Sequence, residues 1–189
     1  KKWNKEIRIE NRMVGSVYAD INFLRFFNLR TTFYGDMSNL DNNRYSPIIY
    51  TYNPTVGPNG SVYKDANNRL TAVDQSNQKW NKFQQDYILT FKKTFGDHGL
   101  TAIAGFTTYY NNFRGIYGNV SQKSTGDSIP NDKRFWYISN GFGDPSSQRS
   151  SSNQWEKATA SGLFRVLYNY KNKYLLNGSF RRDGSSRFS

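Results

Sequence analysis

The sequence predicts an all-β fold, an antiparallel segment of a transmembrane β-barrel with about six strands in three hairpins. Three observations predict this class. Apolar and polar residues alternate along stretches of about ten residues, the length that crosses a bilayer as a tilted strand. Short turns alternate with long polar loops. Apolar residues make up only 36% of the chain while aromatic residues reach 17%, which indicates β-structure whose surface meets something other than water.

The composition also excludes several classes of protein. Cysteine is absent, so the chain has no disulfide framework and no thiol nucleophile. The net charge is +12, but the basic residues are spread along the chain, which argues against nucleic-acid binding and fits a solvated basic surface. No apolar run reaches the roughly 18 residues of a transmembrane helix. The chain opens in mid-pattern at Lys1, and we expect a fragment of a longer protein.

The first predicted hairpin joins strands at about 12–22 and 27–36 through a short turn near 23–26. In the second of these strands Phe27, Leu29 and Phe33 fall on one face, and Arg30 falls on the other. A period of two with one apolar and one polar face predicts a strand between two different environments.

Two further hairpins repeat the pattern. Strands at about 85–95 and 100–111 flank a turn at 96–99, and strands at about 158–169 and 174–181 flank the turn at 170–173. In the last hairpin Phe164, Val166 and Tyr168 oppose Arg165 across the strand. The recurrence of the pattern in six stretches carries more weight than any single strand.

The order of turns and loops gives the strands a direction. All short turns lie at one end of the predicted sheet, and the long loops at about 37–84 and 112–157 lie at the other. This asymmetry is typical of outer-membrane barrels, with short periplasmic turns and long extracellular loops. We therefore assign residues 1–189 to one β-barrel domain whose apolar face meets outer-membrane lipid. The alternative is a soluble, basic, β-rich binding module for acidic polysaccharide or nucleic acid.

No pattern of residues predicts catalysis, and we expect a protein that is not an enzyme and has no cofactor and no metal. The single histidine, His98, lies in a tight turn as a solvated residue. The cluster of Asp36, Asn39, Asp41 and Asn42 has oxygen ligands at close spacing, but it lacks the glycine and terminal glutamate of a calcium loop. We interpret it as a loop rich in Asp and Asn.

Aromatic side chains in the long loops are the candidate ligand contacts, because they stand among Asn, Gln and Ser that can bind hydroxyl or backbone groups. They are Tyr50, Tyr52, Trp80, Trp136, Tyr137 and Trp155. The alternative for each is packing between loops. A second set, read as a structural element at the rim of the barrel, follows the last strand: Arg181, Arg182, Asp183, Gly184, Ser185, Ser186 and Arg187.

This last set carries a family resemblance. The run KYLLNGSFRRDGSSRF at 173–188, preceded by the turn at 168–171 (YNYK), resembles the signature of SusC/RagA TonB-linked outer-membrane proteins. The segments at 11–12 (NR), 94–98 (TFGDH) and 100–105 (LTAIAG) follow in the order of that family. The similarity covers most of the chain and is most specific at 168–188.

The resemblance implies a 22-stranded barrel in a Gram-negative cell outer membrane, filled by an N-terminal plug domain. It implies active import of an oligosaccharide or an oligopeptide that binds in the loops and lumen and then passes the plug. The implied partners are a SusD-like surface lipoprotein and the TonB–ExbB–ExbD motor, which acts through a part of the protein outside this fragment. The plug, the TonB box and the remaining strands are absent from these residues.

Overall fold

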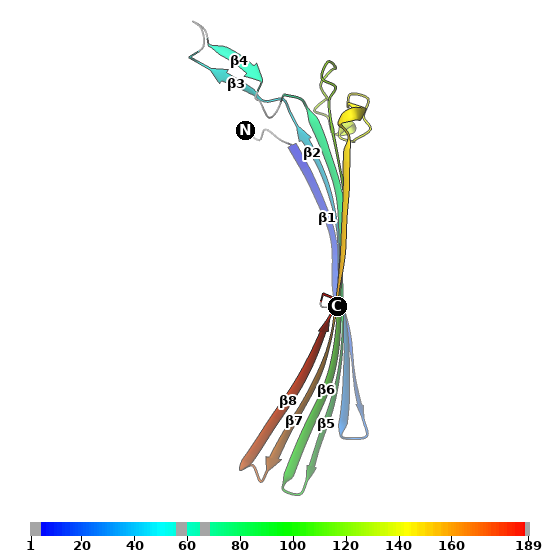
Figure 1. Cartoon of the computed structure of the whole chain (residues 1–189). Helices are drawn as coiled ribbons and strands as arrows, with labels where there is room; N and C mark the ends of the chain where they lie inside the picture. The colour runs from blue at the N-terminus through cyan, green and yellow to red at the C-terminus, as the bar shows by residue number, and fades with distance from the viewer. Residues whose placement is uncertain (1–4, 56–59, 65–68, 188–189) are drawn as a thin grey trace. The chain divides into compact units, whose positions relative to one another are not determined.

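The computed structural model describes residues 5–55, 60–64 and 69–187 and shows one six-stranded sheet with a separate small hairpin (Figure 1). The sheet order follows the chain: β1 (Lys5–Phe23), β2 (Phe27–Ser46), β5 (Ala72–Phe95), β6 (His98–Ser121), β7 (Arg149–Tyr170) and β8 (Tyr174–Ser185). The small hairpin pairs β3 (Tyr50–Asn53) with β4 (Ser61–Lys64). Two short 3₁₀ helices, η1 (Lys133–Phe135) and η2 (Pro145–Ser147), lie between β6 and β7. The predicted all-β class is confirmed.

Neighbouring strands form hairpins, and the register of the last one is fixed over its whole length. β7 and β8 run antiparallel, with Phe164 opposite Phe180 and Arg165 opposite Ser179. Since residues directly opposite one another share a face of the sheet, the two phenylalanines form a cross-strand pair. Register therefore keeps the apolar positions of the two strands on one face.

Three short connections join the hairpin strands, at residues 24–26, 96–97 and 171–173. Two of them place consecutive residues in the left-handed region, Leu24 and Arg25 in the first and Lys171 and Asn172 in the third. Two residues with positive φ give a turn whose twist matches that of the flanking strands. In the second connection Gly96 takes the positive φ, as expected for a residue without a Cβ.

The strands extend beyond the boundaries predicted from the sequence. The strand expected at 27–36 continues to Ser46, that at 85–95 begins at Ala72, and that at 158–169 begins at Arg149. Much of the predicted loops at 37–84 and 112–157 is thus strand, and the residues between β6 and β7 shrink to 122–148. Part of the first predicted loop, residues 56–59 and 65–68, lies outside the described residues.

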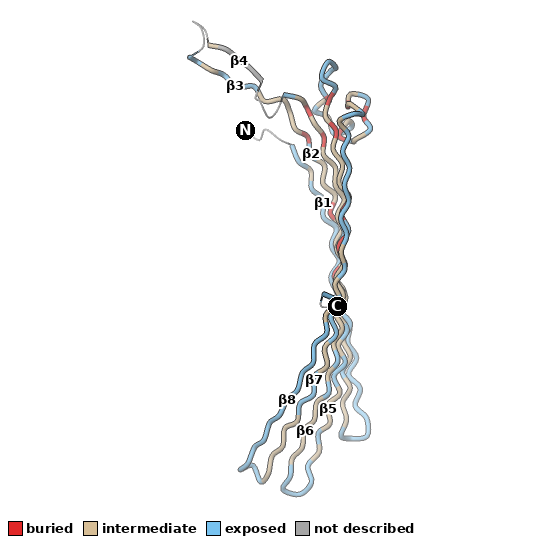
Figure 2. Tube along the Cα trace, in the orientation of Figure 1, coloured by how far each residue is buried: buried red, intermediate tan, exposed pale blue. Residues whose placement is uncertain are grey.

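The contacts divide the chain into two units. The loop-side unit comprises Lys1–Asn11, Asn39–Lys79 and Arg114–Gln154, and the turn-side unit comprises Arg12–Ser38, Trp80–Phe113 and Trp155–Ser189. Five of the six long strands contribute to both units, whereas β8 belongs to the turn-side unit alone. Almost all buried hydrophobic residues lie in the loop-side unit (Figure 2). Within the described part of the turn-side unit, Phe113 is the only buried hydrophobic residue.

Candidate functional site

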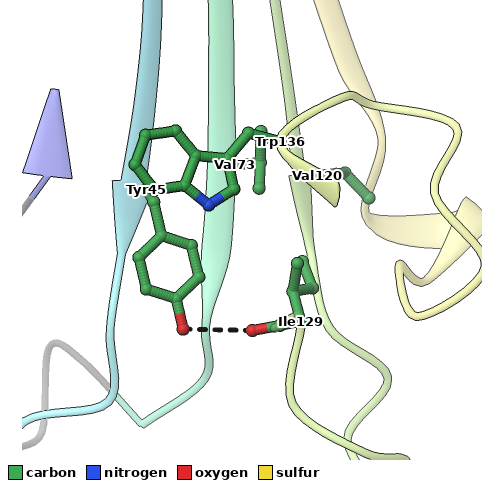
Figure 3. Packing of buried hydrophobic residues seen from close by; sticks show 5 residues of the cluster. All are labelled: Tyr45, Val73, Val120, Ile129 and Trp136. Atoms are coloured by element: carbon green, nitrogen blue, oxygen red, sulfur yellow. Dashed lines mark hydrogen bonds between the residues drawn. The ribbon is translucent and has the colours of Figure 1, made fainter. Parts of the chain in front are cut away.

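A small hydrophobic core holds residues 122–148 against the sheet in the loop-side unit (Figure 3). Its buried members are Tyr45 from β2, Val73 from β5, Val120 from β6, and Ile129 and Trp136 from the connection. The rings of Tyr45 and Trp136 stack with centroids 5.6 Å apart and planes 4° apart. The Tyr45 hydroxyl donates a 3.0 Å hydrogen bond to the Ile129 carbonyl. Residues 122–148 are therefore a folded layer rather than a free loop.

Buried hydrogen bonds fix the start of this layer. The Gln122 side-chain oxygen accepts from the backbone N–H of Thr71 at 2.9 Å and from its hydroxyl at 2.6 Å. The Thr71 hydroxyl oxygen in turn accepts from the backbone N–H of Ile129 at 2.8 Å. Because buried polar groups without partners are costly, this network specifies one arrangement of the connection.

Aspartates cap both short helices of the layer. Asp132 accepts from the backbone and side chain of Arg134, and these bonds lower the pKa of Asp132. Asp144 accepts from the hydroxyl and backbone N–H of Ser146, and the pKa of Asp144 is lowered for this reason. Both carboxylates are thus structural caps of the kind that stabilises helix N-termini.

Amide side chains pair across the strands of the loop-side unit. Asn77 on β5 donates to Asn39 and to Asp41 on β2, and Gln75 donates to Asn43 at 2.9 Å. These bonds use two members of the calcium-like cluster that the sequence suggested, Asn39 and Asp41. Of the other two members, Asp36 lies in the turn-side unit, and the side-chain oxygen of Asn42 has no hydrogen-bond partner among the described residues. Among the described residues, no group of three or more His, Cys, Asp or Glu side chains is placed to hold a metal.

An open groove of about 390 Å³ lies on the loop-side unit. β1, β2, β5, β6 and β7 all contribute lining residues, and nearly all of these are polar or charged. The charged and aromatic lining residues are Glu6, Arg44, Asp74, Tyr117 and Arg149, and Asn42 lies beside them. Asp74 accepts a 2.8 Å hydrogen bond from Asn119, and Arg149 donates to the carbonyls of Ser146 and Gln148. The sequence patterns did not single out this groove, because its residues come from strands that were expected to be loops.

The six aromatic residues predicted as ligand contacts do not converge on one site. Trp136 is 5% exposed inside the loop core, so packing and not ligand contact is its role in this structure. Its neighbour Tyr137 is 44% exposed on the same layer. Tyr50 and Tyr52 are exposed on β3 of the small hairpin. Ligand contact by Tyr50, Tyr52 and Tyr137 stays a prediction.

Trp80 and Trp155, expected in loops, lie instead on β5 and β7 of the turn-side unit. Phe113 on β6 stands between them, with ring centroids 5.1 Å from Trp80 and 5.8 Å from Trp155. The Lys157 ammonium lies 4.2 Å from the centre of the Trp155 ring. Neighbouring rings and the Lys157 ammonium cover the faces of the two tryptophan rings. Trp80, Phe113 and Trp155 therefore form an aromatic ladder that joins β5, β6 and β7.

The same face of the turn-side unit carries paired polar groups. The Asp36 carboxylate is buried and accepts two bonds from Arg12, at 2.8 and 2.9 Å, and one from Lys82 at 3.3 Å. Asp86 accepts from Thr107 at 2.8 Å, and the guanidinium of Arg30 lies 4.9 Å from the Tyr18 ring centre. This face is therefore a network of charged and hydrogen-bonded side chains.

The opposite face is aromatic and apolar. Phe27 contacts Phe91 with centroids 5.0 Å apart, and Phe33 stacks on Phe83 at 6.2 Å. Large apolar side chains of β7 and β8 are exposed, with Phe164 at 50% and Phe180 at 67%. The faces separate as the alternation of the sequence predicts.

The polar block that follows the last predicted strand is partly strand itself. β8 continues to Ser185, so Arg181 to Ser185 pair with β7, and Leu163 stands opposite Arg181. The Arg181 guanidinium donates to Asp183 at 2.9 Å, and the backbone N–H of Ser186 donates to the Ala158 carbonyl at 2.9 Å. These bonds close the end of the β7–β8 hairpin. Phe188, the last residue of the motif, lies outside the described residues.

Comparison with curated proteins finds TonB-dependent receptors. Over 112 residues the chain is 31% identical to TonB-dependent receptor P39 of Formosa agariphila, which covers 56% of the chain and 10% of that receptor. Over 173 residues it is 25% identical to TonB-dependent receptor P3 of the same organism, which covers 91% of the chain and 15% of the receptor. The chain thus spans less than a fifth of each relative. No protein-family model matches.

Solved structures with the same fold include RagAB importers. The match to the RagAB peptide transporter covers 100% of this chain and 19% of the transporter chain, with a TM-score of 0.77 and 17% identity. The closed-closed state of the RagAB peptide importer gives a TM-score of 0.78 and 16% identity. The predicted resemblance is confirmed: the chain is similar to a barrel segment of SusC/RagA-type TonB-dependent transporters.

Within the described residues, no helix is long and apolar enough to cross a membrane.

Proposed function

We propose that this chain forms part of the wall of an outer-membrane, TonB-dependent importer of a nutrient, either an oligosaccharide or an oligopeptide. The observation that carries the proposal is the two-faced sheet of the turn-side unit. Its apolar face is exposed, its opposite face is polar, and its described residues include only one buried hydrophobic side chain. Strands of this kind fit a barrel wall with lipid on one side and a wet lumen on the other.

Contact with lipid explains why large apolar side chains are exposed on this face, which would be unfavourable in water. Soluble monomers rarely expose contiguous apolar patches of more than a few hundred Å². Here β8 alone exposes Leu176 and Phe180 on the face that carries Phe164. Immersion in hydrocarbon removes this cost, provided that every backbone group is paired. β1 and β8 are the edge strands of the sheet, so further strands of the whole protein would complete the pairing.

The soluble binding module is the weaker reading. It requires Phe27, Phe33 and Phe164 to pack inside a closed core between two sheets. The described residues contain one six-stranded sheet and one small hairpin of two four-residue strands, so no second large sheet covers the first. Phe33 and Phe164 are exposed. No observation favours this second function.

The partners of the whole protein follow from its likeness to transporters. We propose that the full-length protein binds a SusD-like surface lipoprotein above its loops. We also propose that the TonB–ExbB–ExbD motor acts on its plug domain. The RagAB neighbours are peptide transporters in their own titles, which supports a nutrient importer with a surface partner. The placement of residues 122–148 outside the cell follows from the same likeness.

Deletion of the gene for the full-length protein tests the proposal. The deletion strain should lose growth on one or a few single glycans or peptides, and plasmid-borne protein should restore it. A strain that keeps the full-length protein but lacks TonB should show the same defect. The protein should be recovered with outer-membrane vesicles. Recovery in the soluble fraction, or unchanged growth on every substrate of the panel, would contradict the proposal.

A further inference from the structure

Aromatic rings follow one another across the strands at the end of the turn-side unit where the three short connections lie (Figure 1). Contacts between neighbouring rings run from β1 through β2 to β5, and again from β6 through β7 to β8. The members of this aromatic row are Phe23, Phe27, Phe91, His98, Tyr170 and Tyr174. Phe27 and Phe91 place the row on the apolar face of the unit. Aromatic belts of this kind lie at the level of lipid headgroups.

One cation stands within this row. The Lys93 ammonium lies 4.2 Å from the centre of the Phe26 ring and 4.7 Å from the centre of the Phe95 ring. Since successive side chains of a strand alternate between faces, Lys93 shares the face of Phe91 and Lys92 lies on the opposite one. Among the described residues, no carboxylate forms an ion pair with Lys93. The rings attract the ammonium but do not neutralise it, so its charge can still bind an anion.

The charges around Lys93 are mostly positive as well. The turn that supplies Phe26 also contains the exposed side chain of Arg25. The Phe26 carbonyl accepts a 2.8 Å hydrogen bond from the backbone N–H of Lys92, which brings this turn beside Lys93. The third connection adds two lysines, one of which pairs with Asp97 at 3.5 Å, and Asp97 is the only acid in the three connections. This end of the apolar face therefore carries an excess of positive charge.

We propose that the turn end of the apolar face binds the headgroup of an anionic phospholipid, with its phosphate between Lys93 and Arg25. The inference rests on the proposed placement of the sheet in a membrane and adds one kind of lipid to it. A phosphate diester carries a full negative charge, and its oxygens accept charged hydrogen bonds from an ammonium and a guanidinium. The acyl chains would lie along the same face, over rings such as Phe91.

Other ligands with a phosphate group fit less well. A zwitterionic phospholipid offers the same phosphate, but its own ammonium group would be repelled by Arg25 and by the lysines of the third connection. Inorganic phosphate would satisfy the charges but would leave the aromatic row beside them without an apolar partner. Only an anionic headgroup with acyl chains matches both the excess charge and the apolar face.

Native mass spectrometry of the full-length protein in detergent tests the inference, because it resolves the first bound lipid from later ones. The probes are dioleoylphosphatidylglycerol, dioleoylphosphatidylcholine and glycerophosphoglycerol, which is the first headgroup without its acyl chains. The variants are Lys93→Gln and Lys93→Arg. Lys92→Gln is the matched control, because it removes the same charge one residue away on the opposite face. Heat-modifiable gel migration verifies that each variant folds.

The wild type should bind phosphatidylglycerol more tightly than phosphatidylcholine. Lys93→Gln should weaken binding of phosphatidylglycerol about fivefold, the effect of one cation near an anionic membrane surface. Lys93→Arg should retain the wild-type affinity, since a guanidinium also binds phosphate, and Lys92→Gln should match the wild type. Added salt should weaken binding of phosphatidylglycerol by the wild type more than by Lys93→Gln.

Equal loss of binding in Lys93→Gln and Lys92→Gln would overturn the inference, because net charge and not a site on the apolar face would then attract the lipid. Equal affinity of the wild type for the two lipids would overturn it as well. Displacement of phosphatidylglycerol by an equal concentration of glycerophosphoglycerol would show a phosphate site that needs no lipid, which also contradicts the proposal.

The lipid site and the import function fail separately. If Lys93→Gln loses phosphatidylglycerol but cells lacking TonB take up nutrients normally, import is wrong and the lipid site stands. If uptake depends on TonB but Lys93→Gln binds phosphatidylglycerol as the wild type does, the lipid site is wrong and import stands.

Discussion

Replacement of Trp136 by alanine should release residues 122–148 from the sheet. The Trp136 side chain is 5% exposed and stacks on Tyr45 at 5.6 Å in the centre of the loop core. Removing a buried tryptophan from a core costs about 3–5 kcal/mol. Because this core joins the connection to the sheet, the cost falls on docking of the connection and leaves the strands paired. A loss of about 3 kcal/mol raises the undocked population roughly a hundredfold.

Limited trypsin digestion of the full-length protein in detergent measures this population. Lys133 and Arg134 are exposed in η1, directly before Trp136, and cleavage there requires local opening. When opening is fast, the cleavage rate follows the open population, so the variant should be cut roughly a hundred times faster. Tyr137→Ala is the matched control, because that ring is 44% exposed. Equal cleavage rates for Trp136→Ala and the wild type would refute the assignment of Trp136 to a docking core.

Three further predictions concern other parts of the chain. Burial raises the pKa of Tyr45 above its ordinary value of 10.0, so docking should be constant below pH 10 and weaken as the pH rises beyond it. Tyr45→Phe should abolish this pH dependence in tryptophan fluorescence and cost about 1 kcal/mol at neutral pH for the lost hydrogen bond; a wild type insensitive to alkali would contradict the burial argument. Phe164→Arg should destabilise the protein in lipid by about 2–4 kcal/mol in urea titration, whereas Ser161→Arg, beside Asp183 on the opposite face, should cost less; equal costs would mean that neither face meets lipid. At Gly118 an added methyl group would overlap the Cδ1 atom of Ile138, which must rotate to another position. Gly118→Ala should therefore weaken docking by up to about 1 kcal/mol and speed tryptic cleavage by up to about fivefold, whereas Gly162→Ala, with open space around it, should leave cleavage unchanged.

The strand order could be predicted because it depends on alternation and turn chemistry. Both signals are local, and Phe27, Leu29 and Phe33 against Arg30 express them in one strand. The lengths of the strands could not be predicted in the same way. The stretch at 37–46 is rich in Asn and Asp, residues that favour turns and loops. In the structure Asn39, Asp41 and Asn43 bond side chains of β5, so partners distant in sequence overrule the local preference.

The candidate site also depends on contacts between residues that are distant in the sequence, which local patterns do not reveal. The aromatic content of the loops predicted ligand contacts at Trp80, Trp136 and Trp155. In the structure the rings of Trp80 and Trp155 pack against Phe113, and the ring of Trp136 stacks on Tyr45. The groove of the loop-side unit is lined by residues far apart in the sequence, such as Glu6, Asp74 and Arg149, and these residues form no motif. A groove assembled from five strands becomes visible only when the pairing of those strands is known.

The loop core also defines the smallest piece that could be moved to another protein. Residues 122–148 supply Ile129 and Trp136, but Tyr45, Val73 and Val120 belong to three different strands of the sheet. A chimera that exchanged the connection alone would leave half of the core behind and present a hydrophobic layer with nothing to dock on. Recombination or engineering that preserves this layer must transfer its three strand positions along with it, together with the small residue at Gly118. The surface that can vary without loss of docking is accordingly the exposed rim of the layer, not its interior.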